Sequence, residues 1–177
     1  MTRTFRILST VFALGLAALA QVGQTLPRLE GTTLDDQKII LPDAARYHAV
    51  VLIFGFSHKS ADQADGWGKR LAKEYSSQPT VGYFEVPVLQ SAPGMVRPMI
   101  VHGMRKGTPA AEQGHVLIVS QHEAELKKLS GYHEPDDAYA MVAAPDGRIV
   151  WQTHGAVTDT SYADLVRSVA SLTGSSK

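Results

Sequence analysis

The alternation of apolar and polar residues along the chain predicts buried strands separated by amphipathic helices. The stretch Ala49–Phe54 is an unbroken apolar run followed by Gly55. It is too short for a helix and predicts a fully buried strand. Apolar residues then recur with helical spacing from Ala61 to Tyr75, which predicts a helix directly after a short polar turn. Val81–Val86 predicts a second buried strand, and a strand–helix–strand unit favours a parallel α/β arrangement.

Shorter elements are predicted on either side of this unit. In chain order they are a hairpin over residues 29–34 and 38–41, a strand over 115–119, a helix to about 129, a hairpin over 139–143 and 149–153, and a closing helix over 162–172. The second hairpin has the strong turn signal Pro145-Asp146-Gly147. Ser60 with Gln63, and Ser120 with Glu123, match the capping-box pattern for the start of a helix.

Residues 90–114 are rich in proline, glycine and methionine and are too long for a plain connection in a compact domain. They predict an inserted or functional segment, with a short helix from Pro98 to about Lys106 because proline suits a first helical turn. Residues 1–20 have two arginines, an apolar stretch and Ala18-Leu19-Ala20, the pattern of a cleaved secretory signal peptide. We therefore expect an exported protein with one domain over residues 21–177 and no integral membrane segment after cleavage; an uncleaved anchor is the alternative.

Composition removes several classes of function. The 177 residues contain no cysteine, which excludes disulfides, thiolate nucleophiles and iron–sulfur ligation. The formal net charge of zero shows no excess of positive charge of the kind that binds nucleic acid.

A family resemblance begins at FGFSHKSADQADGW, residues 54–67. This segment resembles the reactive loop of thioredoxin-like proteins, and most of all that of the copper-delivery proteins that help to assemble cytochrome oxidase. On that alignment Lys59 and Gln63 occupy the cysteine positions; a Cys-x-x-Cys alignment instead selects Ser57 and Ser60. The resemblance implies a thioredoxin-like three-layer α/β/α sandwich with an N-terminal β-hairpin and an insertion at about residues 90–114. It departs from the family at Asp136-Asp137-Ala138, where thioredoxin-fold enzymes have a cis-proline.

A second resemblance covers Val81 to about Arg167. The segment His102-Gly103-Met104-Arg105-Lys106-Gly107, the run VLIVSQHEAELKKL, and the hairpin Pro145-Asp146-Gly147-Arg148-Ile149-Val150-Trp151 are similar to the mitochondrial ATP-synthase assembly factor family, which has a thioredoxin-like fold. This resemblance implies a chaperone or assembly factor that binds another protein, such as a subunit of a membrane complex under assembly. It implies neither a redox enzyme nor a bound cofactor.

Two segments carry the candidate binding residues. Ser57, His58, Lys59 and Ser60 lie at a predicted helix start, where free N–H groups favour an anion or a partner; the alternative is that Ser60 caps the helix and the others are solvated. The second segment contains Met95, Met99, His102 and Met104. Methionine there suits packing or a partner-binding surface, whereas thioether and imidazole together suit Cu(I).

Charged residues provide further candidates for binding a partner or a metal. Arg105 and Lys106 either bind a carboxylate or phosphate of the partner or form a solvated turn. The pairs His133-Glu134 and Asp136-Asp137 match no specific metal motif. We expect the surface of Ser57–Ser60 and Met95–Gly107 to bind a protein partner, with copper binding as the alternative.

Overall fold

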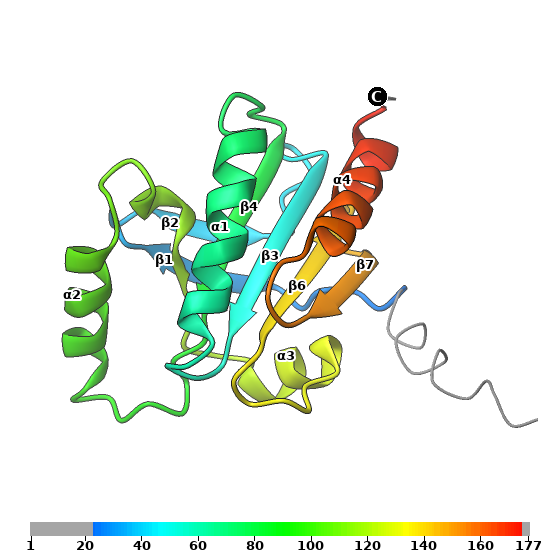
Figure 1. The fold of residues 1–177 in the computed structure, drawn as a ribbon. Helices are drawn as coiled ribbons and strands as arrows, with labels where there is room; N and C mark the ends of the chain where they lie inside the picture. The colour runs from blue at the N-terminus through cyan, green and yellow to red at the C-terminus, as the bar shows by residue number, and fades with distance from the viewer. Residues whose placement is uncertain (1–22, 175–177) are drawn as a thin grey trace, which may run out of the picture.

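The structure is a computed structural model that describes residues 23–174 (Figure 1). The predicted signal peptide at residues 1–20 lies outside the described residues. The elements are β1 (Leu29–Thr33), β2 (Lys38–Leu41), β3 (Ala49–Gly55), α1 (Ala61–Tyr75), β4 (Val81–Pro87), α2 (Arg97–Gly107), the 3-10 helix η2 (Gln113–His115), β5 (Leu117–Ile118), α3 (Glu123–Ser130), β6 (Ala138–Ala143), β7 (Ile149–His154) and α4 (Asp159–Thr173). The order of strands and helices is the one that the sequence predicts.

The central sheet has four strands in the order β4-β3-β6-β7. β3 and β4 run parallel, with Ala49 opposite Val81 and Gly55 opposite Pro87. β6 is antiparallel to both β3 and β7. The prediction that the first two buried runs are neighbouring, co-directional strands is therefore confirmed.

A smaller sheet joins the N-terminal hairpin to the later part of the chain. Its order is β2-β1-β5, all antiparallel. The strand predicted over residues 115–119 is shorter than expected, since only Leu117–Ile118 pair as a regular strand. Val116 and Val119 instead form single parallel bridges to Glu85 and Val88, so this segment links the two sheets.

Helices cover both faces of the central sheet because side chains alternate along its strands. Val51 and Ile53 pack with residues of α1 and α4, whereas Leu52 and Phe54 pack with residues of α3 and the hairpin. Figure 1 shows α1 and α4 on the same side of the central sheet. Trp67 of α1 is fully buried and donates from Nε1 to the Gly155 carbonyl at 3.0 Å. The result is the three-layer arrangement with an N-terminal hairpin that the sequence predicts.

The segment between β4 and β5 contains α2, which starts at Arg97 with Pro98 in its first turn, close to the predicted start. None of the residues of α2 is buried. Polar bonds at its C-terminal half hold it instead. Arg105 donates from Nε to the Leu34 carbonyl and from Nη2 to Asp36, both at 2.7 Å. Gln113 donates to the Arg105 carbonyl at 3.1 Å.

Both predicted capping boxes are wrong. The Ser60 hydroxyl donates to the Ser57 carbonyl at 2.8 Å and makes no cap bond, while Gln63 points to the loop before β6. Glu123 accepts from the Ser91 backbone and hydroxyl, so its carboxylate is not available to Ser120. Gln63 and Glu123 thus bond to partners distant in sequence instead of to the start of their own helix. Over residues 23–174, no helix is long and apolar enough to cross a membrane.

Candidate functional site

The two residues that align with the cysteines of the copper-delivery family contact the loop before β6. Lys59 Nζ lies 3.1 Å from Asp136 Oδ2. Gln63 donates to Asp137 Oδ1 at 3.2 Å and accepts from the Ala138 N–H at 3.0 Å. Among the described residues the one cis peptide bond is Leu41–Pro42, so this loop contains none. Polar bonds therefore occupy the place where the family has its thiols and cis-proline.

Asp137 is the better shielded of the two aspartates. Its side chain is 23% exposed and accepts from His154 Nδ1 at 2.7 Å. This hydrogen bond, with a further one from Gln63, holds the pKa of Asp137 below its usual range. Lys59, by contrast, is 77% exposed in its pair with Asp136, so that pair stabilises the loop little.

The contacts between the Ser57–Ser60 loop and the loop before β6 include no arrangement for nucleophilic or metal chemistry. Ser57 Oγ lies 3.5 Å from Asp136 and accepts from the Ser60 N–H at 3.2 Å, so its bonds are to these two residues rather than to a histidine base. Within residues 23–174, no group of three His, Asp or Glu side chains is placed to hold a metal ion. The structure therefore gives no support to a metal site at His133-Glu134 and Asp136-Asp137.

A groove of about 620 Å³ separates α2 from the start of α1 and the ends of β3 and β4. Its α2 wall is one helical stripe: Met99, Ile100, Gly103, Met104 and Gly107. The opposite wall includes Ser57 and His58; Ser60 also borders the groove but is fully buried, so it cannot contact a partner as predicted. Met99 is 69% exposed, unusual for a large apolar side chain. The structure thus places parts of the two predicted segments, Ser57–Ser60 and Met95–Gly107, on facing walls of one groove, although they are far apart in the sequence.

The remaining predicted residues of the second segment lie elsewhere. His102 and Arg105 border a separate hollow of about 510 Å³, together with Pro98 and Val101, on the opposite face of α2. Met95 precedes the helix and is 95% exposed. Lys106 is exposed. The four candidate copper ligands therefore do not converge on one side of the helix.

Glu85 is a site residue that sequence reasoning missed. It lines the groove from β4, facing Gly68 of α1 so closely that a Cβ on Gly68 would lie 1.8 Å from Glu85 Oε1. Burial raises the pKa of Glu85 to about 7; Asp65 and Glu112 add to the rise and Lys69 opposes it. One signal was available: Glu85 is the single charged residue within the apolar run Val81–Pro87.

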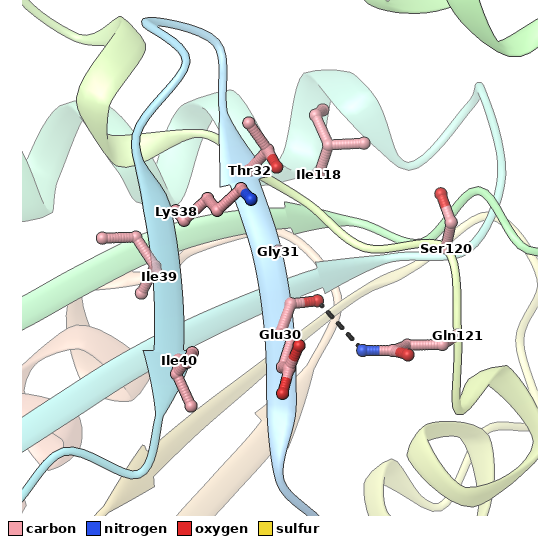
Figure 2. A pocket seen from close by; sticks show the side chains of 9 residues that line it. All are labelled: Glu30, Gly31, Thr32, Lys38, Ile39, Ile40, Ile118, Ser120 and Gln121. Atoms are coloured by element: carbon pink, nitrogen blue, oxygen red, sulfur yellow. Dashed lines mark hydrogen bonds between the residues drawn. The ribbon is translucent and has the colours of Figure 1, made fainter.

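Other hollows contain none of the predicted site residues. One, of about 390 Å³, lies on the outer face of the small sheet (Figure 2). There Gln121 donates to the Glu30 carbonyl at 3.3 Å, and Ile40 is partly exposed beside Lys38 (Figure 2). A larger one, of about 750 Å³, includes Tyr47 and His115. The groove beside α2 is therefore the candidate functional site.

Comparisons with known proteins place the chain by its fold. No protein-family model matches it, and no curated protein matches it. Solved structures do match. The exposed lipoprotein thioredoxin Etrx1 of Streptococcus pneumoniae is 16% identical, with 80% of this chain and 98% of that chain covered and a TM-score of 0.56. A putative thiol:disulfide interchange protein DsbE of Chlorobium tepidum is 14% identical, with 85% and 96% covered and a TM-score of 0.57.

A third match is BsSco, a member of the Sco family of cytochrome c oxidase assembly proteins. It is 13% identical, with 88% of this chain and 99% of that chain covered and a TM-score of 0.53. At such identities the likeness concerns the fold alone. The chain has a thioredoxin-like fold, as its sequence predicts, in a protein without cysteine.

Proposed function

We propose that this protein is an exported, non-redox member of the thioredoxin fold that binds another protein as a chaperone or assembly factor. The groove beside α2 is the observation that supports this function. It combines exposed Met99 and half-buried Met104 with a polar loop on the opposite wall. Methionine is an adaptable contact residue, and an exposed apolar groove is a common form of protein-binding surface.

The chemistry of the fold's usual reactive loop supports the non-redox part of the proposal. Thiol–disulfide exchange and peroxide reduction both proceed through a thiolate, and the sequence has no cysteine. At the two positions that align with the cysteines of the copper-delivery proteins, Lys59 is bonded to Asp136 and Gln63 to Asp137. We expect no turnover in an insulin-reduction assay; measurable turnover above buffer would refute this part.

The neighbours in the structure comparison are consistent with an assembly role outside the cytoplasm. BsSco is described as an assembly protein and Etrx1 as an exposed lipoprotein. A partner that belongs to a membrane complex under assembly is in line with the description of BsSco.

A photo-cross-linking experiment tests the partner-binding site. p-Benzoylphenylalanine replaces Met99 in one variant and Met95 in another, and each is expressed in full length in cells. Both side chains are highly exposed, but only Met99 borders the groove. We expect irradiation to cross-link a defined protein from position 99 and not from position 95. Identical products, or none from position 99, would contradict the proposal.

Copper binding is the second candidate. Met99 and His102 are exposed and three residues apart on α2, so one ion can reach both if their side chains turn toward each other. A Cu(I) competition titration tests this. Stoichiometric binding that is lost in a Met99→Leu, His102→Ala double variant would support copper, and no binding by the wild-type protein would eliminate it.

A further inference from the structure

The groove beside α2 has a one-sided distribution of charge. Its ionisable lining residues are Asp62, Asp65, Glu85 and His58, and no lysine or arginine is among the described residues that line it. Lys69, outside the groove, pairs with Asp65 at 2.6 Å. Asp62 and Glu85 have no such partner among the described residues. Carboxylates thus face a hollow that is otherwise largely apolar.

The apolar part of the groove has room for bulky side chains. Met99, Ile100 and Met104 of α2 line it with flexible or branched apolar side chains, whereas Val86 below them is fully buried. On the same α2 stripe, a Cβ added to Gly103 or Gly107 would meet no atom within 4 Å. The open backbone there allows an occupant to approach the helix closely.

We propose that the groove binds a cationic apolar peptide segment, in which a lysine or arginine meets Glu85 and Asp62 while neighbouring apolar side chains pack on Met99 and Met104. This inference rests on the proposed function, because it specifies the part of the partner that enters the same groove. Charge complementarity selects this occupant over an acidic or neutral one. The largely buried Glu85 carboxylate repels anions and remains uncompensated beside neutral groups, and the exposed Asp62 adds negative charge at the rim of the groove.

Long basic side chains fit the geometry of such a site. The aliphatic stem of lysine or arginine packs on apolar surface while its charged end reaches an acid. The groups that face Glu85 are Asp65 and Lys69 from α1, Glu112 before η2, and His115 within η2. Burial and the two nearby carboxylates keep the pKa of Glu85 near 7, and an incoming cation favours its ionised form.

Three fluorescein-labelled peptides test the proposal. All carry leucine and phenylalanine at the same positions, and they differ only in having lysine, glutamine or glutamate between them. Fluorescence anisotropy with the mature protein at pH 8 is expected to give an affinity for the lysine peptide at least tenfold above that for the glutamate peptide. Asp62→Asn and Glu85→Gln should each reduce this preference, whereas the control Glu134→Gln, an exposed carboxylate outside the groove, should not.

The pH dependence supplies a second readout. With a Glu85 pKa of about 7, the affinity for the lysine peptide should fall roughly tenfold from pH 8 to pH 6 as Glu85 takes up its proton. Glu85→Gln should remove this change; His58 is present in both proteins, so its contribution cancels in the comparison. An unchanged pH dependence in Glu85→Gln would overturn the inference.

The outcomes separate this inference from the proposed function. If the three peptides bind equally and cross-linking from position 99 persists, the groove binds proteins without the charge preference, and only the present inference fails. If no peptide binds and position 99 cross-links nothing, both fail. Because Asp62 is on the surface of α1, Asp62→Asn keeps the test decisive even if Glu85→Gln does not fold.

Discussion

Replacing Glu85 with glutamine should make the protein more stable at neutral and alkaline pH. The folded-state pKa of about 7 lies above the ordinary value of 4.5, so the folded protein holds the proton more tightly than the unfolded chain. The stability from this proton is therefore complete below about pH 4.5 and is lost as the pH rises through 7. A difference of about 2.5 pH units corresponds to up to about 3 kcal/mol at pH 8. Glutamine remains neutral and avoids this loss.

Urea unfolding measures this effect. Tryptophan fluorescence is a suitable signal because Trp67 is fully buried. The free energy of unfolding of the wild-type protein, minus that of Glu85→Gln, should become more negative by up to about 3 kcal/mol from pH 4.5 to pH 8, with most of the change between pH 5 and pH 7. Groups common to both proteins cancel in the difference. Glu134→Gln controls for the loss of one carboxylate. A difference that does not vary with pH would refute the account of Glu85.

Two further contrasts test the contacts around the site. Gln63→Ala should lower the free energy of unfolding by about 1–3 kcal/mol, because it leaves the buried Ala138 N–H without its acceptor. Lys59→Ala should lower it by less than about 1 kcal/mol, because the ion pair of Lys59 is exposed. Equal losses in urea unfolding would contradict this assignment. Arg105→Ala should speed amide hydrogen exchange over residues 97–107 with little change in the global transition, because its bonds to Leu34 and Asp36 hold α2 to the hairpin. Lys106→Ala is the matched control, and similar exchange in both variants would show that α2 is held in another way.

Much of the fold could be predicted because its signals are local. The apolar run at Ala49–Phe54 and the Pro145-Asp146-Gly147 turn each specify an element without help from distant residues. The capping boxes failed for the opposite reason. Gln63 is bonded to residues more than seventy positions away, a relation that no local pattern contains.

The candidate site was predictable only in part. The segments at Ser57–Ser60 and Met95–Gly107 were identified, but which face of α2 meets the groove depends on how the helix is held. Bonds from Arg105 to Leu34 and Asp36 attach one face to the hairpin, so Met99 and Met104 on the other side line the groove. Glu85 was missed because its properties arise from Asp65 and Glu112, which only the folded chain brings near it.

The absence of buried side chains on α2 affects how long a complex can last. Because α2 is attached through a few polar bonds, it moves at small energetic cost. It can therefore adjust to partner side chains of different volume. The same freedom limits affinity, because ordering the helix consumes part of the interaction energy. If the groove binds a polypeptide as proposed, we therefore expect short-lived complexes with a fast dissociation rate.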